Sequence, residues 1–316
     1  QYPASDTVQK AMLPLVDRDG LTKPVLQIIA EEALESGIEE ICVVAAPGDE
    51  DYYRHHFRSY AQMLASAFRG IAWAEEQAKR LSALERALHF VVQAQPLGYG
   101  HAVARARDFV GDAPFLLLLG DHLYISGESR RCARQVIDLA EAESCSVSAV
   151  QTRREHLIHH YGTLTGRRLA NRPDVYAIDE IIEKPNPTLA ELRLYLPGLR
   201  AGHYLCFFGM HVLTPIVFEL LDEIGREAAG ELRAEGDGGP IQLTPALNLL
   251  AHRERYLALE TQGSRHNIGV KFGVVEAQIA LSLAGEDRQQ MLSMLLESIL
   301  RIEQQSPQQP PPPLAN

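Results

Sequence analysis

Cysteine is scarce in this sequence and never occurs at the spacing of a metal or disulfide site. The four cysteines are Cys42, Cys132, Cys145 and Cys206, and no two of them form a CxxC pair. Widely spaced cysteines of this kind are typically small buried hydrophobes in a reducing compartment. We therefore expect no disulfide framework, and we expect the protein to be cytoplasmic.

Positive charge and long apolar runs are also in short supply. The chain has 30 Lys and Arg residues against 41 Asp and Glu, for a net charge of -11. Nucleic-acid binding depends on Lys and Arg displacing counterions from phosphates, so we expect no nucleic-acid partner. No apolar run approaches the roughly 20 residues that span a bilayer, so we expect no membrane partner. A small phosphorylated ligand still fits, because a few local cations suffice.

Strand and helix patterns alternate through the first half of the chain. They predict a helix over 22–37, capped by Thr22 and Gly37, then a strand over 38–47 and a helix over 50–68. A strand over 89–94, a helix over 101–110 and a strand over 114–121 follow. The last run, PFLLLLGD, is apolar on both faces, which predicts a central parallel strand. This alternation indicates a doubly wound α/β sheet.

The second half predicts a more mixed pattern. Strands are expected at CSVSAVQ, DVYAIDEIIEKP, HYLCFFGMHVL and YLALETQG, with helices over 214–224, 241–252 and 273–284. A final helix over 285–304 places one apolar stripe on a single face, expected to pack on the body or a twin subunit: Met291, Leu292, Leu295, Ile299 and Ile302. The Pro/Gln-rich tail over 305–316 is expected to be disordered.

Candidate chemistry lies where strands end. In doubly wound sheets ligands bind beyond the carboxyl ends of the strands, which places the loop PLGYG (96–100) and Asp121 on one rim. Asp121 is suited to Mg²⁺, which takes one or two carboxylates plus phosphate oxygens, although a strand-terminal Asp can equally cap a turn. Glu183 and Lys184, in EKP, suit sugar hydroxyls and phosphate, or form an exposed ion pair. Asn267 and Lys271, in NIGVKFG, flank a glycine at the start of another helix.

An ordered series of short motifs connects these candidates. The series is AMLPLVD, KP, SGIEEICVV, PLGYGHAV, GDHLY, EKP, IQLTPAL and NIGVKFG. It resembles the bacterial UTP-glucose-1-phosphate uridylyltransferases of the sugar-nucleotidyltransferase superfamily, from Gln1 to about Leu283. The resemblance implies a Rossmann-like doubly wound mixed sheet with a C-terminal helix. It also implies one nucleotidyltransferase domain over 1–284, with a nucleotide-binding half of about 1–150 and a sugar-binding half of about 151–284.

The resemblance further implies the reaction and its residues. UTP and glucose 1-phosphate would react with Mg²⁺ as cofactor to give UDP-glucose and pyrophosphate, in a homodimer or homotetramer. Lys10 corresponds to a nucleotide-phosphate lysine, and Gln93 and Gly98 to uracil-recognising positions. Asp121 and Asn267 fall at metal-binding positions. The remaining matches contact the sugar or its phosphate, and Lys271 also the developing charge: Gly162, Glu183, Lys184, Gly209 and Lys271.

The sequence departs from the family pattern at the phosphate end. The family's GxGTR loop, which precedes xxPA, is absent from a sequence that starts at QYPA, and Ala11, Asn267 and Pro245 replace the usual Glu, Asp and Asp. We expect Gln1 to mark a trimmed or disordered start of an active uridylyltransferase. The alternatives are a divergent relative that binds nucleotide or sugar without efficient catalysis, and a nucleotidyltransferase that uses another nucleotide such as dTTP.

Overall fold

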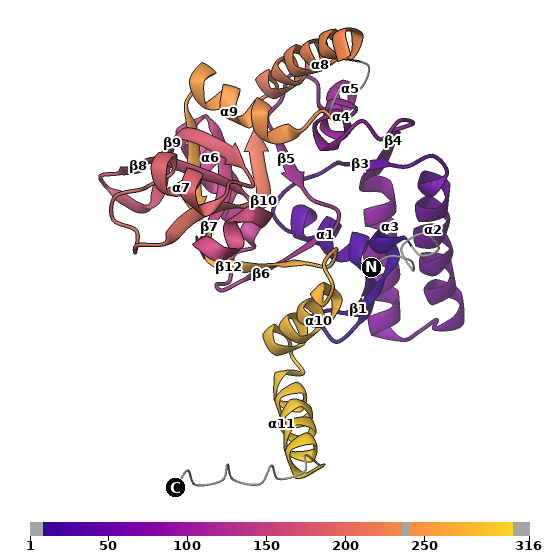
Figure 1. Ribbon diagram of the computed structural model, residues 1–316. Helices are drawn as coiled ribbons and strands as arrows, with labels where there is room; N and C mark the ends of the chain where they lie inside the picture. Colours follow the sequence, from indigo (N-terminus) through magenta and orange to yellow (C-terminus); the bar gives the residue numbers. More distant parts are fainter. Residues whose placement is uncertain (1–8, 236–239, 306–316) are drawn as a thin grey trace, which may run out of the picture. The chain divides into compact units, whose positions relative to one another are not determined.

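The computed structural model describes residues 9–235 and 240–305 and is drawn as a ribbon in Figure 1. The chain forms two compact units: residues 29–265 are one, and residues 1–28 together with 266–316 are the other. The predicted disordered tail lies outside the described residues, except for Gln305 at the end of the last helix. No helix in the described ranges is long and apolar enough to cross a membrane.

A six-stranded mixed sheet is the centre of the 29–265 unit. Its strand order is β5-β10-β7-β11-β9-β8. The strands are β5 (Phe115–Leu118), β7 (Ser146–Arg154), β8 (Gly162–Leu169), β9 (Arg172–Glu183), β10 (His203–Leu213) and β11 (Tyr256–Glu260). β11 runs parallel to β7, and the other pairings are antiparallel. The predicted mixed α/β sheet is thereby confirmed.

Helices cover both faces of this sheet (Figure 1). One face packs on α8 (Ile216–Glu235) and α9 (Leu243–Arg253), through a cluster that includes Phe218, Leu247 and Leu205. The other face packs on α6 (Cys132–Glu143), through a cluster that includes Val136 and Met210. Coverage of both faces explains why β10 is buried along nearly its whole length.

The prediction of a central parallel strand over 114–121 is wrong. Among the described strands β5 pairs only with β10, and the pairing is antiparallel. Its side chains nevertheless face apolar clusters on both sides, Phe115 and Leu117 on one and Leu116 and Leu118 on the other. A continuous apolar run requires both faces of a strand to be covered, and it does not require both edges to be paired.

A helical pair and a small sheet complete the first part of this unit. β3 (Ile41–Ala45) and β4 (Leu88–Val92), both predicted as strands of the one sheet, form a separate two-stranded parallel sheet. α2 (Asp49–Ala67) confirms the predicted helix and carries three acidic residues in its first turn. α3 (Ala72–Ala87) was not predicted, although its buried residues Ala74, Ala78, Leu81 and Leu84 show helical spacing.

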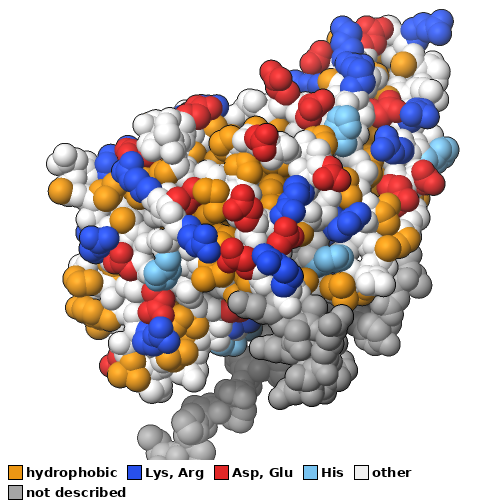
Figure 2. All heavy atoms as spheres, turned by 90° about the horizontal axis from the view of Figure 1, so that it is seen from above, with side chains coloured by type: hydrophobic (Ala, Val, Ile, Leu, Met, Phe, Trp, Pro, Cys, Tyr) orange, Lys and Arg blue, Asp and Glu red, His pale blue; other side chains and the backbone are white. Residues whose placement is uncertain are grey.

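The remaining elements of the unit are short. α4 (Tyr99–Ala104) and α5 (Arg107–Val110) replace the single helix predicted over 101–110. β6 (His122–Ser126) pairs with β12 (Gly263–Asn267), and a 3-10 helix, η3 (Glu155–His160), and α7 (Pro187–Arg193) connect strands of the large sheet. Figure 2 shows Lys and Arg interspersed with Asp and Glu on one face, so the described residues visible there form no extended positive surface.

The other unit contains a hairpin and two helices. η2 (Lys10–Met12) precedes β1 (Pro14–Val16) and β2 (Thr22–Pro24), which pair antiparallel, and α10 (Gly273–Ala284) and α11 (Arg288–Gln305) follow later in the chain. The Gln278 side chain bonds both backbone groups of Val16, at 2.9 and 3.0 Å. Lys23 is buried against Asp17, at 2.8 Å.

The helix predicted over 22–37 begins later than expected. α1 spans Val25–Leu34, and Thr22 lies in β2 opposite Val16, so the prediction of Thr22 as the helix cap is wrong. Threonine is a suitable residue for a helix N-cap. Here, however, the backbone of Thr22 pairs with β1 in the hairpin, so the residue lies before the start of α1. Gly37 adopts a φ of +93° in the turn that ends the helix.

Glu32, on α1, caps a helix that lies far along the chain. Its carboxylate accepts hydrogen bonds from the Ala133 backbone N–H (2.9 Å) and from Arg131 (3.3 Å), at the start of α6. The carboxylate is 3% exposed, whereas Glu35, which also pairs with Arg131, is 47% exposed. Glu32 therefore replaces the local side-chain cap that α6 lacks, and its negative charge suits the helix N-terminus.

Replacing Glu32 with Ala should lower the free energy of unfolding by about 2–3 kcal/mol, because a buried N–H and a guanidinium both lose their acceptor. The matched variant Glu35→Ala removes a partner of the same arginine from the surface and should cost no more than about 1 kcal/mol. Urea unfolding followed by circular dichroism measures both. Equal losses in the two variants would contradict the capping role.

Candidate functional site

Seven of the predicted site residues lie in the 29–265 unit. They come from five separate segments of the sequence: Gln93, Gly98, Asp121, Gly162, Glu183, Lys184 and Gly209. Lys10, Asn267 and Lys271 lie in the other unit. Within each unit, the helices, strands and turns that carry these residues determine how they lie relative to one another.

The Gln93 side chain makes hydrogen bonds to the loop that precedes α4 and to α4 itself. The Gln93 amide nitrogen donates to the Gly98 carbonyl oxygen (3.2 Å) and lies 2.8 Å from His101 Nδ1. A carbonyl oxygen only accepts, so the group facing Gly98 is the NH₂ of the amide. When His101 Nδ1 accepts the second proton, the Gln93 carbonyl oxygen remains to accept a hydrogen bond from a ligand.

The backbone of Ile241 makes hydrogen bonds to the same loop and to α4. The Ile241 backbone N–H donates to Leu97 O, and the Gly100 N–H donates to Ile241 O, both at 2.8 Å. Gly98 has a φ of +110°, and a Cβ there would lie 2.5 Å from the Ile241 carbonyl oxygen. The predicted motif IQLTPAL thus includes the backbone that fixes PLGYG, and Gly98 is required by conformation and by close approach.

Asp121 follows β5 in a turn and contacts a buried histidine. Its Oδ1 lies 2.7 Å from His122 Nδ1, and its side chain is 33% exposed. Burial lowers the pKa of His122, against the raising effect of Asp121, so the imidazole is neutral near neutral pH. Because an ionised carboxylate only accepts, the imidazole proton lies on Nδ1, and His122 fixes one oxygen of Asp121 in place.

Tyr99, the first residue of α4, was missed by sequence reasoning. Burial raises the pKa of Tyr99, and the negative charge of Asp121 raises it further. Its hydroxyl is buried and has no hydrogen-bond partner among the described residues. Buried polar groups are normally bonded, so a donor is available here for a ligand beside the Asp121 carboxylate.

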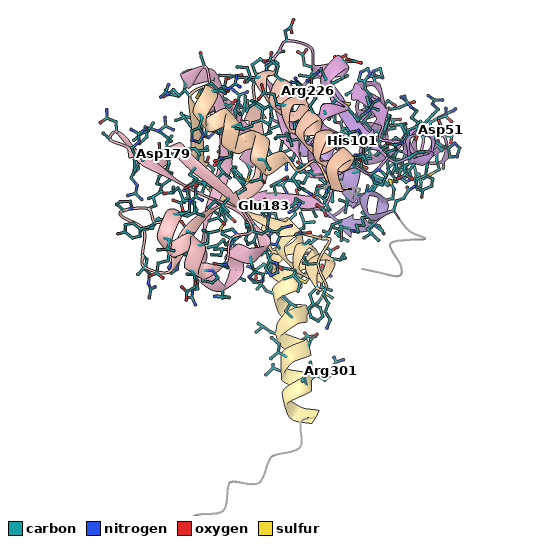
Figure 3. All side chains as sticks on the ribbon, turned by 45° about the horizontal axis from the view of Figure 1, so that its top comes forward. Asp51, His101, Asp179, Glu183, Arg226 and Arg301 are labelled. Atoms are coloured by element: carbon teal, nitrogen blue, oxygen red, sulfur yellow. The ribbon has the colours of Figure 1, made fainter. Side chains whose placement is uncertain are left out.

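Glu183 and Gly162 lie directly opposite each other on β9 and β8. The Thr244 hydroxyl donates to Glu183 Oε2 (2.6 Å), and Lys184 Nζ lies 3.5 Å from Oε1. A Cβ on Gly162 would lie 2.7 Å from the Phe207 ring and 3.2 Å from Glu183 Oε2. The glycine therefore keeps the space in front of the carboxylate open. Figure 3 labels Glu183 among the surrounding side chains.

Lys184 has an unusual backbone conformation. Its φ is +46°, which is uncommon for a residue with a side chain, and its N–H donates to Tyr161 O at 3.0 Å. This turn ends β9 and directs the chain into Pro185. The arrangement brings Glu183 and Lys184 together with Gly162.

Gly209 lies on the Asp121 side of the same region. A Cβ at this position would lie 2.7 Å from Leu119 Cδ1, 3.6 Å from Tyr124 Oη and 3.7 Å from His122 Cδ2. The Gly209 carbonyl oxygen accepts a hydrogen bond from Tyr124. The predicted Gly209 is thus in contact with the turn that carries Asp121.

The predicted residues of the other unit are Lys10, in η2, and Asn267 and Lys271, in the segment from the end of β12 to the start of α10. The Asn267 amide oxygen accepts a hydrogen bond from the Gly269 N–H at 2.7 Å. Lys271 Nζ lies 5.1 Å from the centroid of the Phe272 ring. Lys10 begins η2. No three His, Cys, Asp or Glu side chains of the described residues converge as a metal cluster.

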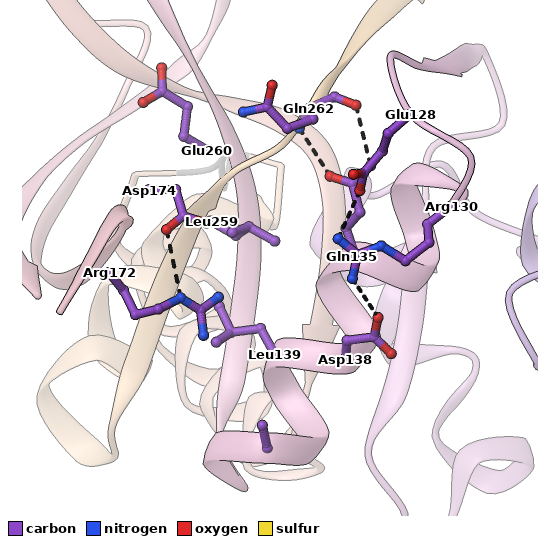
Figure 4. A pocket seen from close by; sticks show the side chains of 11 residues that line it. Glu128, Arg130, Gln135, Asp138, Leu139, Arg172, Asp174, Leu259, Glu260 and Gln262 are labelled. Atoms are coloured by element: carbon purple, nitrogen blue, oxygen red, sulfur yellow. Dashed lines mark hydrogen bonds and ion pairs between the residues drawn. The ribbon is translucent and has the colours of Figure 1, made fainter.

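A separate cavity of about 240 Å³ contains none of the predicted residues (Figure 4). Most of its charged lining residues form ion pairs, Arg130 with Glu128 (2.9 Å) and Asp138 (3.1 Å), and Arg172 with Asp174 (3.6 Å), while Glu260 accepts from the Thr152 hydroxyl (2.7 Å). The cavity is also smaller than most ligand pockets. It is therefore a solvated network of ion pairs, distinct from the Asp121 and Glu183 region.

Comparison with known proteins identifies the family to which the chain belongs. The family model described as "Nucleotidyl transferase" matches residues 2–233. A UTP–glucose-1-phosphate uridylyltransferase of Bacillus subtilis (strain 168) is 32% identical over 307 residues, covering 96% of this chain and 93% of the relative. Another from that strain, YngB, is 30% identical over 301 residues, covering 95% and 91%.

A solved structure extends the likeness to the fold. A UDP-glucose pyrophosphorylase complexed with UDP-glucose is 28% identical, with a TM-score of 0.67, and the match covers 88% of this chain and 92% of that one. The resemblance inferred from the ordered motifs is confirmed by these relatives. The chain therefore belongs to the nucleotidyl transferase family.

Proposed function

We propose that the protein transfers a uridylyl group from UTP to glucose 1-phosphate. A phosphate oxygen of glucose 1-phosphate attacks the α-phosphorus of UTP, the bond from that phosphorus to the β-phosphate oxygen breaks, and pyrophosphate leaves. The names of the curated relatives support this reaction. The observation that carries it is that β10 lies against the turn bearing Asp121 at Gly209 and against Gly162, the partner of Glu183, at Phe207, two residues earlier.

Uracil suits the hydrogen-bonding groups around Gln93. Both amide protons of Gln93 are directed to Gly98 and His101, so its oxygen is oriented to accept from a base. Uracil offers an N3–H donor to such an acceptor, whereas cytosine presents a lone pair at N3. This arrangement supports UTP over CTP. Thymine has the same edge as uracil, so dTTP is the second candidate, and its extra methyl group would be discriminated by only about 1–3 kcal/mol.

We propose Asp121 as the residue that holds Mg²⁺. It supplies a partly exposed carboxylate beside the buried, unpartnered hydroxyl of Tyr99, and Mg²⁺ takes few protein ligands because substrate phosphates and water complete its shell. By the family resemblance Asn267 stands at another metal-binding position, where it offers an oxygen without a negative charge. When bound, the ion would neutralise phosphate charge.

The chain's own groups position the substrates. Glu183, held by Thr244, would accept hydrogen bonds from sugar hydroxyls, and Lys10, Lys184 and Lys271 would meet phosphates. Phosphoryl transfer asks a protein mainly for positioning and charge neutralisation, so no side-chain nucleophile is needed. In agreement, burial raises the pKa of the nearby Cys206 thiol to about 11, which keeps it protonated.

Asp121→Ala should reduce Mg²⁺-dependent pyrophosphate release at least about a hundredfold, because a group positioned toward the reacting phosphates is lost. Gly111–Asp112 repeats the Gly-Asp pair of Gly120–Asp121 on an exposed turn, so Asp112→Ala is the matched control and should retain full turnover. Coupled detection of pyrophosphate measures both variants, and thermal unfolding should show both folded. An Asp121→Ala enzyme with normal turnover would contradict the assignment.

We propose that α11 mediates association with a second copy, as a homodimer or within a homotetramer. Of the predicted apolar stripe, Met291, Leu292 and Leu295 are half-buried, while Ile299 and Ile302 are 53% and 65% exposed. Leu296 and Leu300 add exposed apolar surface on another side of the helix, at 60% and 54%. A helix that is apolar on more than one side is stable in water only when a further surface covers it.

Leu296→Asp combined with Leu300→Asp should therefore lower the molar mass of the particle in sedimentation equilibrium at micromolar concentration, because two charges would be buried unpaired in the interface. Gln290→Asp lies on the polar stripe shared with Glu297 and Arg301 and should leave the mass unchanged. A wild-type chain that sediments as a monomer would contradict the proposal.

A further inference from the structure

Arg153 and Arg265 are two half-buried cations in the 29–265 unit. Arg265, on β12, places its guanidinium carbon 4.7 Å from the centroid of the Tyr161 ring. Arg153, on β7, donates a hydrogen bond to the Gln151 amide oxygen. Among the residues that the structure describes, neither arginine has a carboxylate within ion-pair distance. Half-buried arginines are usually paired, because removing a charge from water is costly.

The two guanidinium groups lie in one region of the 29–265 unit, where β7 meets β12. The Gln151 side chain that accepts from Arg153 also donates to the Gly263 carbonyl oxygen, two residues before Arg265 on β12. Both charges also act on Cys206, which lies opposite Gln151 on the neighbouring strand. Like charges in one half-buried region repel, so the region is short of one negative group.

The region adjoins the residues proposed to bind the sugar phosphate. Tyr161, under the Arg265 guanidinium, immediately precedes Gly162, and its carbonyl oxygen accepts the Lys184 N–H. The carboxylates of this region are already engaged, Glu183 by Thr244 and Lys184, and Asp121 by His122. An anionic ligand would therefore supply the counter-charge that the described carboxylates do not give the arginines.

Both arginines are held in place before a ligand arrives. The Gln151 amide that accepts from Arg153 also donates to the Gly263 carbonyl oxygen at 2.6 Å, which joins β7 to the start of β12. The flat Tyr161 ring supports the Arg265 guanidinium. Preorganised guanidinium groups suit phosphate, since each can offer two parallel N–H donors to its oxygens.

We propose that Arg153 and Arg265 form an anion subsite that binds the phosphate of the sugar 1-phosphate. This inference rests on the proposed function and adds two residues that the family resemblance did not assign. The pair would fix the attacking phosphate beside Gly162 and Glu183 and partly neutralise its charge. They are binding and positioning residues toward one substrate, and the nucleotide is held elsewhere by Gln93 and Gly98.

Direct binding and steady-state kinetics test the subsite separately from turnover. Isothermal titration of the full chain with glucose 1-phosphate, with and without UDP present, measures affinity, and methyl α-glucoside serves as the neutral probe. Arg153→Met and Arg265→Met should each raise the Kd and KM for glucose 1-phosphate at least roughly tenfold, while the KM for UTP changes little. Lys at either position should restore part of the affinity, because charge returns without the two parallel donors.

Arg167→Met is the matched control. Arg167 is 79% exposed and pairs with Asp179 on the surface at 3.1 Å, so its loss should leave both KM values unchanged. If a Met variant fails to fold, as judged by thermal unfolding, the Lys variant at that position decides the question.

The outcomes separate this inference from the proposed function. Unchanged glucose 1-phosphate affinity in folded Met variants, or a rise confined to the KM for UTP, would overturn the subsite while leaving the reaction in place. The wild-type chain could also bind glucose 1-phosphate in a way that depends on the two arginine charges and yet show no turnover. That result would support the subsite and reject the reaction. Absence of any binding of glucose 1-phosphate to the wild type, with or without UDP, would also overturn the subsite.

Discussion

The bulge at Gly209 in β10 determines how the functional segments of residues 29–265 meet. The register of β10 against β7 shifts between Phe207 and His211. Before the bulge β10 pairs with β8, and after it with β5, so the start of β8 and the turn after β5 approach the same point. Gly209 has a φ of +83°, and a Cβ would lie 2.7 Å from Leu119. Only glycine meets both demands without displacing that turn.

Around this point the polar groups are oriented before any substrate binds. His122 holds Asp121, Thr244 holds Glu183, and Gln151 and Tyr161 hold the two arginines. Groups fixed in this way need little reorganisation when charge develops, which is how a site without a covalent nucleophile accelerates phosphoryl transfer. His211 fits the same picture: burial lowers its pKa to about 3, so it is a neutral core residue rather than a base.

The sequence predicted the mixed sheet and the residues that join at the bulge, because ordered motifs such as PLGYG and EKP specify turns and close approaches. It placed β5 centrally, since apolar periodicity reports covered faces and not paired edges. It missed Tyr99, Arg153 and Arg265, whose importance depends on burial and on absent partners that only tertiary contacts reveal. It also missed Glu32, because a cap supplied from about a hundred residues away leaves no local signature.

Nucleotide selection tests the central claim most directly. With Mg²⁺ and glucose 1-phosphate, initial rates of sugar-nucleotide formation should be measured with UTP and with CTP, and the product identified by mass spectrometry. The account predicts UDP-glucose from UTP, with kcat/KM for CTP at least about a hundredfold lower, because the Gln93 oxygen would face a lone pair on cytosine. Equal turnover of CTP, or nucleotide binding with no product from UTP, would contradict it.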